Sequence, residues 1–280
     1  MKILRRDITT KKQPFIIAEI SANHNNSMAR TLKIIQEAKK VGANAIKLQT
    51  YDANSMTLNS NNKFFLINDK KSLWYKKNLY DLYNKAALPY SWYKEIFAEA
   101  KKNNIICFST PFDENAVDFL SNFNVPAYKI ASFENNHLPL IEKVIKKKKP
   151  IIISLGATTE KEIKFLYNFL IKKKFYNFAF LQCTSSYPAR IEDSNIKTII
   201  DLKKKYKVEI GLSDHTPGIG AAIAAVSYGA TIIEKHFTLD KNAGGFDVVL
   251  SMDPDVFWLL VNATKTAWLR LGELSFTLSK

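Results

Sequence analysis

The stretch VEIGLSDHTPGIGAAIAAVSYGATIIEKHF, residues 208–237, decides the fold of this chain. Two short runs of mainly apolar residues, VEIGLSD (208–214) and TIIEKHF (231–237), flank an alanine-rich segment that predicts one short helix. Near-continuous apolar strands joined by a helix are typical of a parallel sheet that is covered on both faces. The stretch therefore predicts a strand–helix–strand unit, with His215 and His236 at the ends of its two strands.

The same pattern extends through the chain. Six further strand-like runs lie at residues 15–21, 45–51, 105–112, 127–132, 150–156 and 178–186. Amphipathic helical patterns separate most of them, and a final helix follows the eighth run. Eight alternations of strand and helix in roughly 250 residues predict a TIM (β/α)8 barrel, here over residues 1–272. A doubly wound open sheet is the alternative, but no GxGxxG motif follows the first strand, where such a sheet would carry one.

Composition narrows the class of protein. The chain has 280 residues and a net charge of +15, and its lysines are spread over helix-like segments without interleaved aromatic residues. This pattern predicts a solvated helix surface rather than a nucleic-acid interface. No apolar run reaches the roughly 18 residues of a membrane helix, and no signal peptide is visible, so we expect a cytoplasmic protein with no membrane contact. Cys107 and Cys183 lie inside strand-like runs and are expected to be core residues.

Polar residues stand at the carboxyl ends of all eight predicted strands. In a TIM barrel these ends open on one face, where the active site lies. A charged residue inside an apolar strand is costly unless it is paired or functional, so a whole ring of polar residues indicates a site. The cationic, hydroxyl-rich part of the ring predicts binding of a small anion with phosphate or carboxylate oxygens. Its members are Lys47, Thr110, Lys129, Ser132, Ser154, Ser185 and Ser213.

His215 and His236 end consecutive strands, so a parallel barrel makes them neighbours across its mouth. Asp214, next to His215, is counted with the same ring. Two neutral imidazoles can ligate a divalent metal and leave positions open for water and substrate. Because no third protein ligand is evident, Mn²⁺ or Mg²⁺ fits better than zinc. The alternative is that one histidine is structural and the other is a general base.

Several ordered motifs together resemble the N-acetylneuraminate (sialic acid) synthase family. They are IIAEISANHNNS, AIKLQTY, STPFDE, VPAYKIASFE, LQCTSSYPA, GLSDHTPGIGAAIAAVSYGATIIEKHFTLD and GGFD, and they run from about residue 14 to about 270. The resemblance implies a metal-dependent TIM barrel that condenses phosphoenolpyruvate with an amino-sugar aldehyde. KIASFE and CTSSYP resemble pseudaminic acid synthases more than sialic acid synthases, which implies 2,4-diacetamido-2,4,6-trideoxy-L-altrose as the sugar in place of N-acetylmannosamine.

The resemblance also implies roles for individual residues. The cationic and hydroxyl set named above would contact phosphoenolpyruvate, and the two histidines would hold the metal. Glu19, Tyr187 and Asp247 would bind hydroxyl and amide groups of the sugar. Gln49, Glu134 and Glu234 match family positions near the reacting atoms, where proton transfer is the expected role, and Glu19 completes the expected catalytic group. Carbon C3 of phosphoenolpyruvate would attack the aldehyde, water would add at C2, and phosphate would leave.

Two departures from the family pattern affect these expectations. Phe246 stands where family members usually carry proline, which is expected to displace the Asp247 loop. Residues 273–280 match only the start of a linker that, in the family, leads to a small antifreeze-like domain; that domain is absent from this sequence. The resemblance implies a homodimer in which the domain reaches over the partner's barrel.

Two other functions suit the same residues. A Schiff-base aldolase would use Lys129 or Lys47 as its nucleophile. A barrel without its second domain could instead bind phosphoenolpyruvate without turnover.

Overall fold

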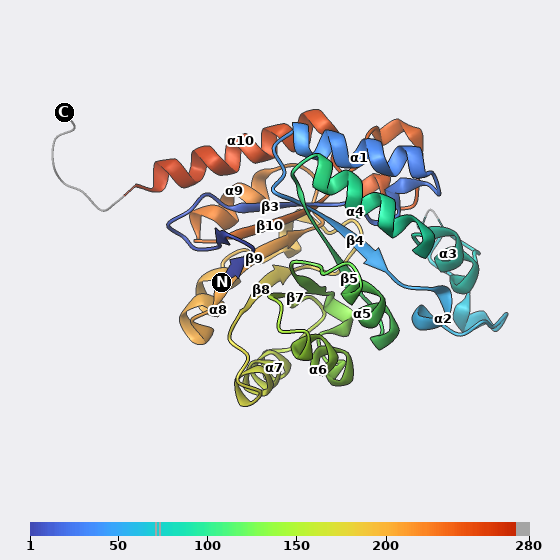
Figure 1. Ribbon diagram of the computed structural model, residues 1–280, viewed down its shortest axis with the longest axis horizontal. Helices are drawn as coiled ribbons and strands as arrows, with labels where there is room; N and C mark the ends of the chain where they lie inside the picture. Colours follow the sequence, from blue (N-terminus) through green and yellow to red (C-terminus); the bar gives the residue numbers. More distant parts are fainter. Residues whose placement is uncertain (71, 73, 273–280) are drawn as a thin grey trace.

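The computed structural model describes residues 1–70, 72 and 74–272. Eight parallel strands close into a barrel in the order β10-β3-β4-β5-β6-β7-β8-β9 (Figure 1). This closure confirms the predicted TIM barrel and makes the open-sheet alternative wrong. The strands are β3 Phe15–Glu19, β4 Ala45–Thr50, β5 Ile106–Pro111, β6 Tyr128–Ile130, β7 Ile151–Ser154, β8 Phe178–Cys183, β9 Glu209–Asp214 and β10 Ile232–His236. Each lies within one of the eight predicted runs.

Helices surround the barrel, as Figure 1 shows. They are α1 Met28–Lys40, α4 Tyr93–Lys102, α5 Glu114–Ser121, α6 Leu138–Lys146, α7 Glu160–Lys172, α8 Thr198–Tyr206, α9 Gly220–Ser227 and α10 Pro254–Leu271. Local sequence sets several of their starts. Thr159 and Glu162 form a reciprocal capping box at α7, and the Asp253 side chain accepts from the backbone N–H of Val256 at the start of α10.

Smaller elements complete the chain. Two short helices, α2 Ala53–Met56 and α3 Leu79–Ala86, lie between β4 and α4. The 3-10 turns are η1 Ser21–His24, η2 Lys63–Phe65, η3 Tyr90–Trp92, η4 Ser132–Glu134, η5 Ile191–Ser194, η6 Lys241–Ala243 and η7 Val248–Leu250. The first residues form an antiparallel pair, β1 Lys2–Ile3 and β2 Arg6–Asp7.

Two cores hold the barrel together. The inner core consists of side chains that point into the lumen, including Phe15, Phe108 and Ile152, and Ile3 and Ile8 of the amino-terminal segment belong to it. The outer core packs the other faces of the strands against the helices. Because apolar residues fill the lower lumen, polar side chains inside the barrel are confined to the carboxyl ends of the strands.

No helix in residues 1–70, 72 and 74–272 is long and apolar enough to cross a membrane. The predicted linker start, residues 273–280, lies outside the described residues.

Candidate active site

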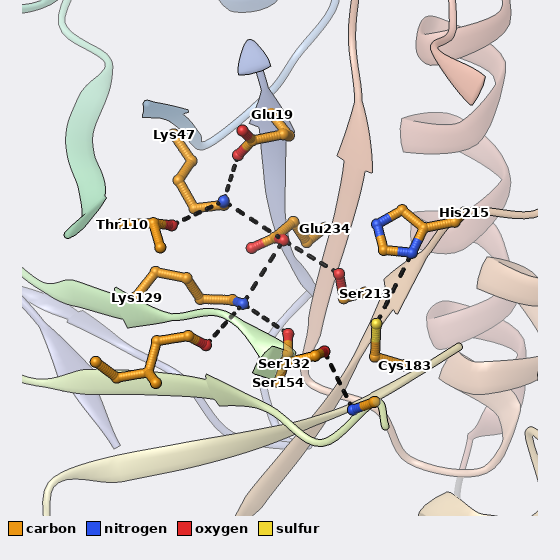
Figure 2. Close-up of polar contacts among 12 residues, drawn as sticks. Glu19, Lys47, Thr110, Lys129, Ser132, Ser154, Cys183, Ser213, His215 and Glu234 are labelled. Carbon is orange, nitrogen blue, oxygen red and sulfur yellow. Dashed lines mark hydrogen bonds and ion pairs between the residues drawn. The ribbon is translucent and has the colours of Figure 1, made fainter. Parts of the chain in front are cut away.

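A charged cluster occupies the lumen just above the inner core. Glu19 of β3 and Lys47 of β4 are register partners, and the Lys47 ammonium contacts the Glu19 carboxylate (Figure 2). Lys47 Nζ also donates to Thr110 Oγ1 at 3.1 Å and lies 3.7 Å from Glu234 Oε1. Strand register thus brings together residues from β3, β4, β5 and β10.

A second lysine approaches the Glu234 carboxylate from the opposite side. Lys129 Nζ lies 3.9 Å from Glu234 Oε1 and donates to Ser154 Oγ at 2.6 Å and to the Ile130 carbonyl at 3.1 Å (Figure 2). Ser213 Oγ donates to Glu234 Oε1 at 3.1 Å. Glu234 therefore sits between two ammonium groups, with hydroxyls from β7 and β9 beside them.

The four charges of this cluster are buried and balanced. Lys47 and Lys129 are 4% and 2% exposed, and Glu19 and Glu234 are 1% and 5% exposed. Burial alone would raise the pKa of Glu234, but the attraction of Lys129 and Lys47 outweighs it and lowers that pKa. Burial lowers the pKa of Lys129, which Glu234 offsets only in part. The two lysines are paired with the two glutamates inside the cluster. An anionic ligand could replace these ion pairs with its own hydrogen bonds to the lysines.

Hydroxyl groups extend the cluster toward the mouth. Ser132 Oγ accepts from the backbone N–H of Gly156 at 3.2 Å, and Ser185 Oγ lies 3.9 Å from Cys183 Sγ. A Cβ on Gly156 would come within 2.1 Å of Ser185 Oγ and 2.8 Å of Ser132 Oγ. A side chain at this position would therefore displace the two serine hydroxyls, and glycine leaves room for them beside the backbone amide.

The two predicted metal ligands are neighbours at the same end of the barrel. The imidazole centroids of His215 and His236 are 5.3 Å apart, and the Tyr187 ring lies 4.4 Å from that of His215. His215 Nδ1 is 3.0 Å from the Thr184 carbonyl, a hydrogen bond that leaves Nε2 with the lone pair. His236 Nδ1 is buried without a hydrogen-bond partner. Burial and the neighbouring His215 lower the pKa of His236 well below its usual value, which keeps this imidazole neutral.

These groups fit a divalent metal held by two imidazoles. Burial would lower the pKa of His215, but Cys183 and the Thr184 carbonyl outweigh it and raise that pKa, so this ring becomes a ligand once it has lost its proton. The remaining coordination positions would belong to water or substrate. Within the described residues, no group of three or more His, Cys, Asp or Glu side chains could hold a metal ion. The usual three-ligand set of catalytic zinc is therefore not found among them.

A cavity of about 350 Å³ opens above the charged cluster. It is lined by the remaining predicted residues, Gln49, Glu134, Tyr187 and Asp247, together with Ser132 and His236. Asp247 and Phe246 both line the cavity, and the Asp247 carboxylate accepts from the Ser21 hydroxyl and from the backbone N–H of Ala22. Burial raises the pKa of both Asp247 and Glu134.

Unpartnered polar atoms gather in this region. Among the described residues, the buried side-chain atoms without a hydrogen-bond partner include Glu134 Oε2, Glu234 Oε2 and His236 Nδ1. A buried polar group without a partner is costly, and a ligand is one of the common explanations for it. One atom comes from η4 and two from β10, and they face one site, which indicates a binding pocket for a polar molecule.

Known proteins resemble this chain in sequence and in fold. The profile of the NeuB family matches residues 34–275. The chain belongs to the NeuB family. A pseudaminic acid synthase of Campylobacter jejuni is 47% identical over 267 residues, which cover 95% of this chain and 77% of that protein. A pseudaminic acid synthase of Helicobacter pylori is 42% identical over 260 residues, covering 93% of this chain and 76% of the relative.

A solved structure supports the same assignment. The N-acetylneuraminic acid (sialic acid) synthetase of Leptospira borgpetersenii, determined in complex with citrate, superposes on this NeuB-family chain with a TM-score of 0.85. The sequence identity is 32%, and the match covers 96% of this chain and 88% of the other. The barrel expected from the motifs is therefore the fold of the family.

One residue of the predicted ring does not face the pocket of this NeuB-family barrel. Asp214 lies on the outer side of β9, because side chains alternate along a strand and Ser213 points inward. Its carboxylate is paired with Lys235 Nζ at 2.7 Å, and both side chains are buried. The inclusion of Asp214 in the ring was wrong, because a position near the strand end does not reveal on which side of the sheet the side chain lies.

Lys235 and Gly156 are residues that sequence reasoning missed. Lys235 Nζ also donates to the Thr216 carbonyl, and Asp214 Oδ1 accepts from the Thr216 backbone N–H at 2.9 Å. The pair thus fixes the loop that follows His215. For Lys235 the available signal was a lysine in an otherwise apolar run, and for Gly156 it was a glycine two residues after Ser154.

Proposed function

We propose that this chain is a pseudaminic acid synthase, which condenses phosphoenolpyruvate with an N-acetylated amino-sugar aldehyde and releases phosphate. The products are a nine-carbon sugar acid and inorganic phosphate, and one water molecule is consumed. Membership of the NeuB family and 47% identity to the Campylobacter jejuni enzyme support this activity. The structural observation that carries it is the meeting of two buried lysines and two neighbouring imidazoles at one barrel mouth.

The charged cluster would hold phosphoenolpyruvate. The phosphate and carboxylate of phosphoenolpyruvate would accept hydrogen bonds from Lys47 and Lys129 and from nearby hydroxyls. These bonds would replace part of the pairing of the two lysines with Glu234. The hydroxyl donors in this role are Thr110, Ser132, Ser154, Ser185 and Ser213, together with the Gly156 amide. Such preorganised donors stabilise charge that develops on the phosphate as it leaves.

The imidazoles of His215 and His236 would hold the metal, with Mn²⁺ or Mg²⁺ the ions proposed. Bound there, the metal would polarise the aldehyde oxygen of the sugar. Tyr187, Asp247 and Glu19 would orient the sugar through its hydroxyl and amide groups. Asp247 and Tyr187 line the cavity directly, and Glu19 lies beneath it, beside Lys47.

Glu134 and Glu234 would transfer the protons. Burial raises the pKa of Glu134, so this carboxyl can hold a proton and donate it to the oxygen that was the aldehyde. The two lysines keep Glu234 ionised, so its carboxylate can accept a proton from the water that adds at C2. Gln49, which lines the same cavity as Glu134, would orient the aldehyde carbonyl.

The test is a phosphate-release assay with phosphoenolpyruvate, Mn²⁺ and each of two sugars, 2,4-diacetamido-2,4,6-trideoxy-L-altrose and N-acetylmannosamine. We expect release with the first sugar, and we expect it to stop after chelation and to return when metal is added. Thermal stabilisation by phosphoenolpyruvate without phosphate release would instead indicate a barrel that binds but does not turn over.

The Schiff-base alternative has one observation in its favour, the lowered pKa of Lys129. Borohydride reduction in the presence of pyruvate would trap a covalent adduct on Lys129 if that chemistry operated. We expect no adduct, because Lys129 Nζ is held by Ser154 and the Ile130 carbonyl.

We also propose that the chain acts as a homodimer in the cytoplasm. Light scattering coupled to size-exclusion chromatography measures the mass in solution, and a monomeric mass would count against the dimer.

A further inference from the structure

Lys235 is a buried lysine that the proposed chemistry does not use. Its side chain is 1% exposed, and it lies on β10 between two residues of the site, Glu234 and His236. Figure 2 shows Glu234 pointing toward the two lysines of the charged cluster, and side chains alternate along a strand. The Lys235 side chain therefore lies on the outer side of the barrel wall, where it can act on the site only through other residues.

The Lys235 ammonium joins the two strands that carry the histidines. Lys235 and Asp214 are the last register partners of β10 and β9, and Lys235 Nζ donates to Asp214 Oδ2 at 2.7 Å. His215 directly follows Asp214, and His236 directly follows Lys235. The ion pair thus connects the two strands at points that are each one residue away from a proposed metal ligand.

The same ammonium holds the turn that begins after His215. Lys235 Nζ donates to the Thr216 carbonyl. Asp214 Oδ1 accepts from the backbone N–H of Thr216 at 2.9 Å and from its hydroxyl at 2.7 Å. His215 is therefore flanked by two residues, Asp214 and Thr216, that are bonded to Lys235 and to each other. These contacts of Lys235 with Asp214 and Thr216 are called the Lys235 bridge below.

The backbone at His215 lacks the support that a strand gives to His236. His236 is the last residue of β10 and is paired with β3. β9 ends one residue before His215, so His215 lies beyond the ladder between β9 and β10. Its carbonyl accepts from the Ala189 N–H at 3.0 Å, and its Nδ1 lies 3.0 Å from the Thr184 carbonyl. These two bonds link His215 to the loop after β8, whereas the Lys235 bridge links it to the strand that carries His236.

Stability alone does not account for a buried ion pair at this position. Replacing such a pair by apolar residues of similar volume is often neutral or stabilising, because burial removes both charges from water. Hydrogen bonds between charged groups are short and depend on direction, so they fix the atoms that they join. A metal site benefits from this, because its ligands must be held at the required separation by the residues around them.

We propose that Lys235 is a positioning residue for the metal site. Through Asp214 and Thr216, it sets the arrangement of the His215 and His236 imidazoles, whose centroids are 5.3 Å apart with an angle of 60° between the rings. This inference rests on the proposed function, because it requires that the two imidazoles hold a divalent ion. Replacing residues that orient metal ligands typically weakens metal binding by roughly 10- to 100-fold.

The experiment measures the affinity of the full chain for Mn²⁺ by equilibrium dialysis, so that turnover does not enter. Lys235→Met breaks the Lys235 bridge but leaves the Asp214 carboxylate buried and unpaired, which lowers stability. The double variant Asp214→Asn/Lys235→Met removes both charges and breaks the same bridge without leaving a buried charge unpaired. Urea denaturation and the dissociation constant for phosphoenolpyruvate, measured without metal, show whether the fold and the anion site of each variant are intact.

Leu140→Ala is the control for a general loss of stability. Leu140 is buried in the outer core on α6, which follows β6, and β6 lies four strands away from β10 in the closed barrel. This substitution leaves a cavity and destabilises the fold without touching either histidine strand.

We expect the dissociation constant for Mn²⁺ to rise about 10-fold or more in both variants of the Lys235 bridge and to stay unchanged in Leu140→Ala. The constant for phosphoenolpyruvate should be unchanged in all three. An unchanged Mn²⁺ constant in the folded double variant would overturn the positioning role, and so would an equal rise in Leu140→Ala. Failure of the unmodified chain to bind Mn²⁺ would overturn the proposed metal site itself, so the two failures are distinguishable.

Discussion

Replacing Lys129 tests the assignment of the anion site most directly. Lys129 is 2% exposed, and its ammonium is bonded to Ser154 and to the Ile130 carbonyl; Lys129→Met removes that ammonium and keeps most of the length of the side chain. The four-charge cluster then loses one of its two cations, so Glu234 and Glu19 outnumber Lys47. An incoming trianion would meet a site with net negative charge and one hydrogen-bond donor fewer.

The size of the effect follows from burial. Removing one partner of a buried, hydrogen-bonded charge pair weakens binding by about 2–5 kcal/mol. At about 1.4 kcal/mol per tenfold, the dissociation constant for phosphoenolpyruvate should rise at least about 30-fold. Lys129→Gln, which retains a donor but no charge, should fall between Met and the unmodified chain. Salt should change these values little, because buried charges are weakly screened.

The assay is calorimetric titration of phosphoenolpyruvate without sugar, so that turnover does not enter the measurement. Lys143→Met on α6 is the matched control, because Lys143 pairs with Asp118 outside the barrel lumen. Urea denaturation checks that each variant is folded. A dissociation constant within about threefold of the unmodified chain, in folded Lys129→Met, would refute the anion-site reasoning.

The same lysine predicts a pH dependence. Burial lowers the pKa of Lys129, and a bound anion would raise it again, so binding takes up a proton as the pH rises through the lowered pKa. The affinity for phosphoenolpyruvate should therefore begin to fall at a lower pH than an ordinary lysine would cause. Lys129→Gln should lack this decline, and an identical pH profile in both proteins would contradict the assignment.

Three further outcomes are expected. His215→Ala should lose Mn²⁺ binding in equilibrium dialysis together with metal-dependent phosphate release; retained binding and activity would remove His215 from the metal site. Lys235→Met should lower the free energy of unfolding by about 3–5 kcal/mol in urea denaturation, because it leaves the Asp214 carboxylate buried and unpaired; the exposed control Lys205→Met should leave it unchanged, and equal effects would show that burial does not matter here. Glu134→Gln should abolish turnover yet raise the thermal midpoint near neutral pH, because burial raises the pKa of Glu134 above its unfolded value, and the folded state loses stability as the pH rises from the unfolded pKa through the raised one; the gain should vanish below about pH 4, and a gain that is constant with pH would refute this cause.

Much of the barrel could be predicted because its signals are local. Each strand reads as a short apolar run, and helix starts such as Thr159 and Asp253 carry their own caps. The polar strand ends could be recognised for the same reason. Lys47 and Glu234 stand out because each interrupts an apolar run. What these signals do not contain is the side of the sheet on which a polar residue near a strand end will lie.

Asp214 and Lys235 illustrate that limit. Both neighbour pocket residues in the sequence, yet they pair with each other on the outer side of the barrel. Since side chains alternate along a strand, a shift of one residue exchanges lumen for outer face. Irregular strand ends are where the alternation is hardest to read. The part of the cavity lined by Met56, Ile67 and Leu82 was also missed, because these residues come from a segment without a repeating pattern.

By itself, the sequence determined that eight buried strands alternate with helices and that their carboxyl ends carry lysine, glutamate, serine and histidine. Closure of the barrel decided which of these groups meet. Glu234 lies between Lys47 and Lys129 only because β10, β4 and β6 face one lumen, and His236 is left with an unpartnered nitrogen only in that packing. The physical reason is that strand propensity and helix capping act between near neighbours in the chain. Charge pairing and burial depend on residues far apart, which only the folded barrel brings together.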